Sequence, residues 1–311
     1  MPVIAVTGAT GFVGQATVSA LQRAVPNASI RLLIRSPRAR TLPRGFDDCT
    51  VVAGSLGDVD ALATLVDDAD CVIHIAAAIA GNCEADFERH NTGGTRRLVD
   101  TISCNAPETH LIHISSLAAR HPELSWYAAS KRAAEEIVVA RCRRFSILRP
   151  PAVYGPDDPA LADFWRLLAR GWLIRAGDRN ARFSLLHVDD LAEAVCRLVR
   201  HGPAAEILPL AGPEPADGWR WSELAKLAVH TGNRRIRTVP VPAPVLSAGA
   251  AISLMTARMT HRPTLLSPGK ARELLHRNWV CDNQRMSNCL GWTPTTRLEH
   301  ALGTLPGWNS R

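Results

Sequence analysis

The sequence predicts an α/β fold: a doubly wound parallel sheet with a smaller, mostly helical lobe toward the carboxyl end. Three observations support this prediction. Short apolar runs alternate with helical patterns through the first half, a glycine-rich turn follows the first run, and the alternation breaks near residue 150. Consecutive βα units form parallel sheets with right-handed crossovers, and ligands bind beyond the carboxyl ends of the strands.

Six strand-like runs occur in the first half, each short and apolar as buried parallel strands are. They cover residues 3–6, 30–34, 51–53, 71–76, 111–115 and 146–148. Helical patterns lie between them at residues 12–21, 58–65, 86–103 and 127–141. The order is therefore that of successive βα units.

The turn after the first strand carries glycines at every third position, Gly8, Gly11 and Gly14. A side chain here would hold a phosphate away from the backbone N–H groups at the helix N-terminus, where the local field favours an anion. The last glycine lets the helix lie close on the strand. Because the turn follows a strand directly and opens a helix, it indicates a dinucleotide-binding (Rossmann) turn rather than a merely tight connection.

Beyond residue 150 the pattern changes, since prolines and tryptophans become frequent. A helical stretch and a strand-like run at 206–210 follow, and then further Pro/Gly-rich sequence. We expect a dinucleotide-binding domain over residues 1–152, to which residues 183–212 return, and a substrate-binding lobe over residues 153–311.

Composition narrows the classes of partner. The chain has 311 residues, of which 46% are hydrophobic and 21% charged, a balance typical of a globular protein. The net charge of +7 comes from basic residues in several places, without interleaved aromatic side chains. This favours a solvated basic face, suited to an anionic cofactor, over a nucleic-acid surface.

The eight cysteines are scattered and form no C-x-x-C pair. The first strand begins at once, with no charged segment and apolar segment before it. Together these features indicate a reducing cytoplasm and free thiols. His74, His110, His113 and His187 lack metal-ligand spacing, so no metal site is expected.

No apolar run reaches the length that spans a bilayer, so no integral membrane segment is expected. The longest candidate, residues 244–259, is short and ends near Arg258. We favour a helix that covers a pocket, with contact to a membrane surface or a hydrophobic substrate as the alternative.

A second chemical motif lies on the helix expected at 127–141. Tyr127 and Lys131 are four residues apart and so share one helix face. A nearby ammonium favours the phenolate and lowers the pKa of a tyrosine, which can then exchange a proton with a substrate oxygen. Ser115 and Ser116 stand at the end of the preceding strand, where a hydroxyl can bond the same oxygen.

With these motifs the chain resembles the extended short-chain dehydrogenase/reductase family, the NAD(P)-dependent epimerase/dehydratase group. The resemblance is close over residues 3–200 and looser beyond. Residues 34–37 and 290–294 make the dihydroflavonol-reductase and 3β-hydroxysteroid-dehydrogenase branch the nearest. The matching pieces are T-G-A-T-G-F-V-G (7–14), H-I-A-A (74–77), N-T-G-G-T (91–95), S-S (115–116), Y-A-A-S-K (127–131), L-R-P-P-A-V-Y-G-P (148–156) and H-V-D-D-L-A (187–192).

The resemblance implies the following catalytic roles. Tyr127 is the general acid/base, and Lys131 holds the nicotinamide ribose and lowers the pKa of that tyrosine. Ser116, in preference to Ser115, orients the substrate oxygen, and Asn91 helps place the catalytic helix and relay a proton. Members of the family often form dimers through the helix pair that includes this helix, so a homodimer is expected.

The resemblance also implies a set of cofactor-binding residues along the carboxyl edge of the sheet. They are Thr7, Gly8, Thr10, Gly11, Phe12, Val13, Gly14, Arg35, Ser55, Leu56, Ala76, Ala77, Ala78, Tyr127, Lys131, Pro150 and Val153.

The residues after the second strand predict the cofactor. NAD enzymes of this fold usually carry a carboxylate there for the ribose 2′-OH, whereas this chain has Arg35. A guanidinium can pair with a 2′-phosphate, and Arg31, Arg38 and Arg40 add positive potential. Ser55 replaces an aspartate that the family often has near adenine. We therefore expect NADP(H), with NAD(H) as the alternative.

The expected function is the reduction of a ketone or aldehyde, or the reverse oxidation, on a small substrate that can be hydrophobic. Dehydratases of the family carry Asp-Glu where this chain has Leu117-Ala118, which disfavours that chemistry. Two alternatives stay open: a sugar-nucleotide epimerase or dehydratase with tightly bound NAD, and a non-catalytic NADP-binding sensor.

Overall fold

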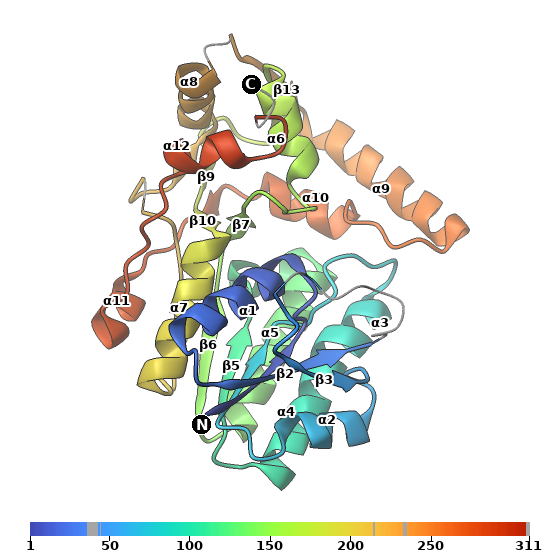
Figure 1. The fold of residues 1–311 in the computed structure, drawn as a ribbon. Helices are drawn as coiled ribbons and strands as arrows, with labels where there is room; N and C mark the ends of the chain where they lie inside the picture. The colour runs from blue at the N-terminus through green and yellow to red at the C-terminus, as the bar shows by residue number, and fades with distance from the viewer. Residues whose placement is uncertain (36–42, 44, 214, 233–234, 309–311) are drawn as a thin grey trace.

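A computed structural model describes residues 1–35, 43, 45–213, 215–232 and 235–308 (Figure 1). Its centre is a parallel sheet with the strand order β11-β6-β5-β4-β1-β2-β3. This confirms the doubly wound α/β fold. The chain order reverses between β1 and β4, so the loops after these strands leave a crevice at the carboxyl edge. The strands are β1 (Val3–Thr7), β2 (Ser29–Ile34), β3 (Thr50–Ala53), β4 (Cys71–His74), β5 (His110–Ile114), β6 (Phe145–Arg149) and β11 (Ile207–Pro209).

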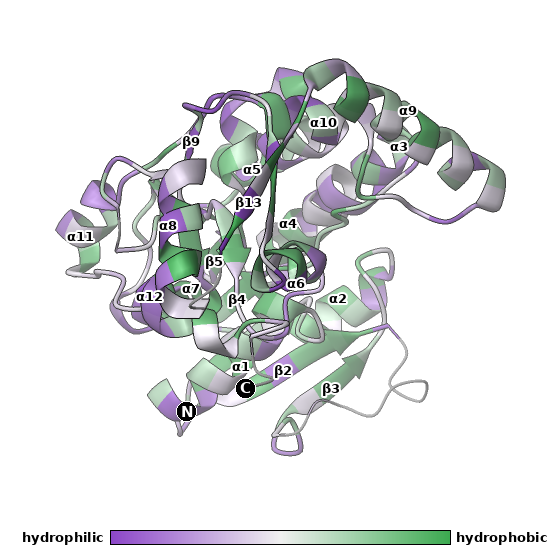
Figure 2. Ribbon diagram, turned by 90° about the horizontal axis from the view of Figure 1, so that it is seen from above, coloured by the Kyte–Doolittle hydropathy of each residue, from purple (hydrophilic) through white to green (hydrophobic). Residues whose placement is uncertain are grey.

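Helices cover both faces of the sheet because successive strand residues point to opposite sides. In β1, Ile4 and Val6 pack with the first set of helices, and Ala5 packs with the second. The first set is α1 (Phe12–Ala24) and α7 (Val188–His201), and the second is α2 (Val59–Val66), α4 (Gly93–Asn105) and α5 (Trp126–Arg141). Figure 2 shows the largely apolar (green) strands β2 and β3 at one edge of the sheet, near α1 and α2.

Two sequence expectations need correction at the carboxyl edge. The strand expected at 71–76 ends at His74, because residues 75–78 turn across the edge toward the loop after β1. The helix expected at 86–103 is three pieces: α3 (Glu84–Phe87), the π-helical turn η1 (Glu88–Thr92) and α4. A π-turn inserts an extra residue per turn, and here it presents the Asn91 side chain to the neighbouring loop.

The C-terminal lobe sits over the carboxyl edge and has its own core, in which Trp165 and Leu224 are fully buried. Its strands are short and its helices dominate, as predicted. It contains β7 (Ala152–Tyr154), α6 (Ala162–Ala169), β8 (Trp172–Ala176), β9 (Arg182–Phe183), β10 (Leu185–His187), β12 (Trp219–Arg220), α8 (Trp221–Gly232), β13 (Arg237–Val241), α9 (Ala243–Thr260), α10 (Pro268–Leu275), β14 (Asn278–Trp279), α11 (Gln284–Leu290), α12 (Leu298–Ala301) and η4 (Leu302–Thr304).

Two segments of the later chain lie against the sheet rather than in the lobe. Helix α7 packs along α1, and β11 pairs with β6 at the edge of the sheet. The connection between β5 and α5 carries two short 3-10 turns, η2 (Leu117–Arg120) and η3 (Pro122–Leu124). These turns lead into the start of α5 at the carboxyl edge.

Candidate active site

The glycine turn is shaped by contacts between backbone segments. A Cβ at Gly14 would stand 2.1 Å from the Gly8 carbonyl oxygen, and one at Gly8, which has φ +76°, would stand 2.6 Å from the Ala76 nitrogen. A Cβ at Gly11 would meet only the Gly8 oxygen, at 3.4 Å. The turn therefore needs glycine at Gly8 and Gly14 for packing, and Gly11 leaves the approach to α1 open.

The N-terminus of α1 is free to receive an anion. Its N-cap, Gly11, offers no side chain to the first N–H groups, and the first turn contains no acidic residue. The first N–H groups of a helix lack partners within the helix and attract negative charge. Thr10 accepts a hydrogen bond from Gln15 through its carbonyl, 2.9 Å away. Phe12 packs beside Gly155 of the β7 loop, and Val13 and Val153 both pack against the core below.

The loop after β4 is fixed by Asn91. The Asn91 Oδ1 accepts from the Ala78 N–H at 2.7 Å, and its Nδ2 donates to the Ala78 carbonyl at 3.0 Å and to Ser130 Oγ at 2.9 Å. Ser130 in turn donates to the Tyr127 carbonyl at 2.8 Å. One buried amide thus joins the 76–78 loop to helix α5, which gives Asn91 a positioning role.

Helix α5 begins at the crevice because Ser125 caps it, accepting from the Ala128 N–H at 2.9 Å. The cap sets Tyr127 in the first turn, half-buried and beside the Phe87 ring. Ser116 caps η2 by accepting from the Ala118 N–H, 3.2 Å away, and its hydroxyl lies near enough to the Tyr127 phenol to lower the pKa of that phenol in part. The structure therefore brings Ser116 and Tyr127 together.

The expected electrostatics of this tyrosine are wrong for this structure. Burial raises the pKa of Tyr127 to about 12, the Ser116 hydrogen bond lowers it in part, and the Glu273 carboxylate raises it further. Lys131 is not among the groups that shift this pKa, and its Nζ donates to the Ile114 carbonyl at 2.7 Å. Tyr127 is accordingly a neutral phenol at physiological pH.

Lys131 belongs to a buried charged network behind the tyrosine. Burial lowers the pKa of Lys131 to about 8, and the Glu135 carboxylate one turn along the helix raises it in part. Glu135 also receives hydrogen bonds from Ser115, at 2.5 Å, and from Arg149 Nε, at 2.8 Å. The serine pair therefore divides its roles, since Ser115 faces the network and Ser116 faces the phenol.

Two neighbours of the site, His74 and Glu273, received no role in the sequence reasoning. His74 bonds Thr7 Oγ1 at 2.7 Å and Thr95 Oγ1 at 3.0 Å, which ties β1 to α4. Burial lowers the pKa of His74 to about 3, so the ring is neutral. Glu273, on α10 of the lobe, accepts from the Ser125 hydroxyl and approaches Tyr127. A pairing across 148 residues of sequence leaves no local signal.

The far end of the crevice is cationic. Arg35 is exposed where β2 ends, and His90 lies near enough to Arg35 and Arg97 for these guanidiniums to lower its pKa, after burial as the first cause. Arg97 Nε donates to the Leu56 carbonyl at 2.6 Å, and Ser55 Oγ accepts from the Gly57 N–H at 3.1 Å. Arg97 therefore fixes the loop that carries the two predicted adenine-side residues.

One other arginine named from the sequence, Arg31, does not join this group. Arg31 donates to the Asp67 carbonyl at the end of α2, away from the carboxyl edge, so its expected contribution is wrong. Arg38 and Arg40 lie outside the residues that the structure describes. Pro150, at the nicotinamide end, accepts from the Leu117 N–H at 2.8 Å and so fixes η2.

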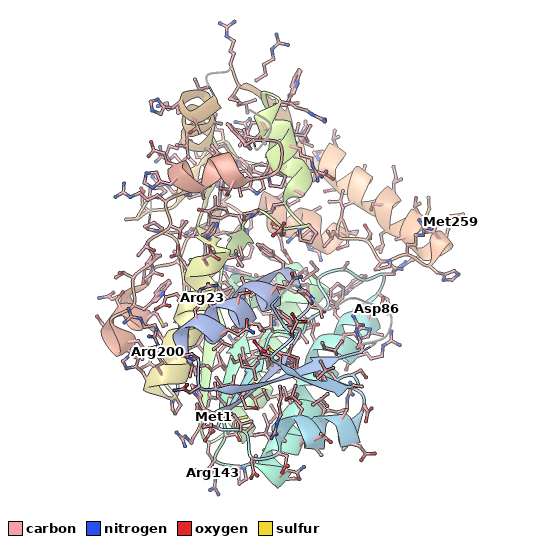
Figure 3. All side chains as sticks on the ribbon, in the orientation of Figure 1. Met1, Arg23, Asp86, Arg143, Arg200 and Met259 are labelled. Carbon is pink, nitrogen blue, oxygen red and sulfur yellow. The ribbon has the colours of Figure 1, made fainter. Side chains whose placement is uncertain are left out.

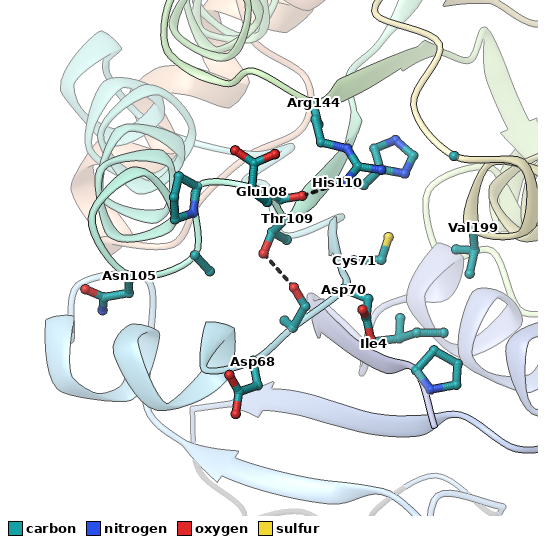
Figure 4. Close-up of a pocket in the computed structure, with 15 residues that line it drawn as sticks. Ile4, Asp68, Asp70, Cys71, Asn105, Glu108, Thr109, His110, Arg144 and Val199 are labelled. Carbon is teal, nitrogen blue, oxygen red and sulfur yellow. Dashed lines mark hydrogen bonds between the residues drawn. The ribbon is translucent and has the colours of Figure 1, made fainter.

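A separate pocket of about 450 Å³ lies at the opposite edge of the sheet (Figure 4). Its polar groups are satisfied within the chain: Thr109 donates to the Ala69 carbonyl at 2.5 Å, and Asp70 accepts from the Val3 N–H at 2.8 Å. It contains none of the predicted catalytic residues, and we place the candidate active site at the carboxyl edge.

Two further findings concern metal ligands and membrane-spanning helices. Among the described residues, no three His, Cys, Asp or Glu side chains gather as metal ligands would. In that same part of the chain, no helix combines the length and the apolar character needed to cross a bilayer.

Comparison with known proteins agrees with this architecture. The family model described as the NAD dependent epimerase/dehydratase family matches residues 4–211. A ceramide reductase of Caulobacter vibrioides is 34% identical, over 98% of this chain and 96% of its own length. A D-erythronate dehydrogenase of Cupriavidus necator is 25% identical, over 99% of this chain and 90% of its own length.

Solved structures share the fold. MoeE5 in complex with UDP-glucuronic acid and NAD superposes with a TM-score of 0.73 at 20% identity, covering 99% of both chains. A dTDP-glucose 4,6-dehydratase from Bacillus anthracis in complex with NAD gives a TM-score of 0.73 at 17% identity, covering 99% of this chain and 96% of its own.

Proposed function

The chain belongs to the NAD dependent epimerase/dehydratase family, and from that premise we propose that it is an NADP(H)-dependent oxidoreductase. It would reduce a ketone or aldehyde, or oxidise the corresponding alcohol, at Ser116, Tyr127 and Lys131. The observation that carries this proposal is that Ser116, Tyr127 and the buried Lys131, one helical turn beyond the tyrosine, lie at the same edge of the sheet as the glycine turn.

The residues present fit a dinucleotide. The Gly8–Ala76 and Gly14–Gly8 approaches leave no room for side chains, and the uncapped first turn of α1 can receive a pyrophosphate. Lys131 and the 76–78 loop would hold the nicotinamide half, and Leu56 and Arg35 the adenosine half. When bound, NADP(H) supplies or accepts the hydride.

The protein's own groups would handle the proton. With its pKa raised to about 12, Tyr127 is protonated near neutral pH and can donate to a substrate oxygen. Ser116, whose hydroxyl lies near the phenol, would orient that oxygen. Lys131, with a pKa of about 8, is charged near neutral pH and would hold the nicotinamide ribose.

The cofactor preference rests on Arg35. This exposed guanidinium at the end of β2 stands where a carboxylate would be needed for a ribose 2′-OH, and it can pair with a 2′-phosphate instead. Neighbouring Arg97 adds positive potential at this end. These features support NADP(H) over NAD(H).

We take the substrate class from a relative that is 34% identical over nearly the full length of the chain. Because that relative is named a ceramide reductase, we propose a hydrophobic ketone, and a ceramide whose long-chain base carries a ketone is the first compound to test. Leu117 and Ala118 offer no acid or base for a dehydration.

Two measurements test the proposal. Thermal unfolding with NADP+, NAD+ or a UDP-sugar identifies the nucleotide, and NADPH consumption with the keto-ceramide in detergent micelles identifies the reaction. We expect stabilisation by NADP+ and formation of the alcohol, with no turnover by Tyr127→Phe. Stabilisation by NAD+ alone together with a UDP-sugar would instead support an epimerase.

A further inference from the structure

Helix α9 leaves an apolar stripe uncovered. Val245, Ile252 and Met259 follow at intervals of seven residues and are 61%, 60% and 76% exposed, and Met255 between them is 59% exposed. Residues at this spacing lie on one side of a helix. The opposite side, including Leu254, is buried against the lobe. The helix projects from the body of the molecule, with Met259 at its outer end (Figures 1 and 3).

Hydrogen bonds join the helix that carries the stripe to the segment after the 76–78 loop of the candidate active site. Arg258 Nε donates to the Asn82 carbonyl at 3.1 Å, and Asn82 Nδ2 donates to the Ala257 carbonyl at 3.3 Å. Ser253 and Thr264 bond each other through their hydroxyls at 2.8 Å. Asn82 follows the 76–78 loop closely in sequence, and Ile79 between them is 51% exposed. The apolar surface therefore continues toward the crevice.

The segment of chain that carries the stripe has charge of one sign. From residue 224 to residue 272 the sequence contains no Asp or Glu, whereas it contains eight Lys or Arg. Arg258, His261 and Arg262 gather at the carboxyl end of α9, and all three are exposed. Asp86, the carboxylate that Asn82 contacts, is already bonded to the Asn82 N–H at 2.9 Å and to Arg89 at 3.3 Å.

We propose that α9 lies on an anionic phospholipid surface, with Val245, Ile252 and Met259 in the interface and Arg258 and Arg262 on lipid phosphates. A helix with an apolar face and cationic residues lies in the interface plane and binds more tightly when the lipids are anionic. The four side chains of the stripe are 59% to 76% exposed, and together they offer far less surface area than the roughly 800 Å² that each partner buries in a stable dimer. This argument favours a lipid surface over a second copy.

The test is co-sedimentation of the full chain with vesicles of phosphatidylcholine alone, or mixed equally with phosphatidylglycerol. We expect binding to the mixed vesicles that weakens with added salt, and little binding to phosphatidylcholine alone. Ile252→Ser/Met259→Ser should reduce the partition coefficient at least tenfold. Arg262→Gln should reduce it about fivefold on mixed vesicles. The matched control, Val229→Ser on α8, removes a 43% exposed valine remote from the stripe and should bind like wild type.

Three outcomes would overturn the proposal: no sedimentation of the wild-type chain, equal sedimentation of the double variant, or a wild-type dimer in light scattering that Ile252→Ser/Met259→Ser converts to monomer. The last would assign the stripe to a second copy. Circular dichroism checks that each variant is folded. Because vesicle binding is measured without nucleotide or substrate, it can succeed or fail independently of the proposed oxidoreductase activity.

Discussion

Gly14→Ala and Gly11→Ala, made separately, should distinguish the packing role of the glycine turn from its role in phosphate binding. At Gly14 the new methyl would stand 2.1 Å from the Gly8 oxygen and 2.7 Å from the Ala9 Cα, both backbone atoms that cannot rotate away. Overpacking of this kind costs up to about 3 kcal/mol, and replacing a helical glycine by alanine returns about 1 kcal/mol. Gly14→Ala should therefore lose about 2 kcal/mol of unfolding free energy.

Gly11→Ala should behave differently. Gly11 has φ −80° and ψ 170°, which alanine adopts without strain, and its Cβ would meet one atom at an ordinary 3.4 Å. Alanine lowers the conformational entropy of the unfolded chain, which stabilises the fold by about 0.4–1 kcal/mol and roughly offsets the loss of glycine at the N-cap. Its methyl would instead stand in the path of a phosphate, and we expect NADP+ affinity to fall at least about tenfold.

Urea unfolding followed by tryptophan fluorescence measures the first effect, and calorimetric titration with NADP+ measures the second. Equal unfolding free energies for wild type and Gly14→Ala would refute the packing role. Wild-type NADP+ affinity in Gly11→Ala would refute the phosphate role.

Four other predictions follow from the site. Tyr127→Phe should keep NADP+ affinity and lose about 10²–10⁴ in turnover, because it removes only the proton donor; steady-state kinetics with normal turnover would contradict this. Arg35→Asp should shift the NADP+/NAD+ affinity ratio at least about tenfold toward NAD+, and titrations that give an unchanged ratio would count against the 2′-phosphate contact. Arg149→Met should cost about 3–5 kcal/mol in urea unfolding, because it leaves Glu135 charged and buried; a cost below about 1 kcal/mol would disprove this. Burial lowers the pKa of His74 to about 3, so neutral His74 contributes fully to the stability of the fold above pH 6.5 and this contribution is lost as the pH falls toward 3, by up to about 1.4 kcal/mol per pH unit. His74→Gln should therefore flatten the dependence of the unfolding free energy on pH in this range. An unaltered slope would contradict this prediction.

Local patterns in the sequence predicted most of the sheet and its helices. Strands β1 and β5 carry buried apolar residues on both faces, so their runs are easy to recognise. The π-turn at Asn91 was not predictable because its cause is a bond to Ala78 in another loop. The expected strand at residues 75–76 failed for a similar reason, since Gly8 draws that segment across the edge.

In the candidate site, too, local motifs were predictable from the sequence and contacts between distant segments were not. The Tyr127–Lys131 spacing and the place of Ser116 at a strand end were recognisable in the sequence, and the structure brings Ser116 near Tyr127. The pKa of Tyr127 went the other way from the expectation because burial and Glu273 outweigh the hydrogen bond, and the lysine charge is held by Ile114 and Glu135. Such terms depend on contacts between distant segments, which no local spacing encodes.

A crystal structure of the full chain with NADP+ is the most direct test of the proposed function. It should show the pyrophosphate at the first turn of α1, the nicotinamide beside Tyr127, Lys131 on the ribose hydroxyls and the 2′-phosphate on Arg35. A nucleotide bound elsewhere, or one whose nicotinamide lies away from Tyr127 while Arg35 points into solvent, would contradict the account.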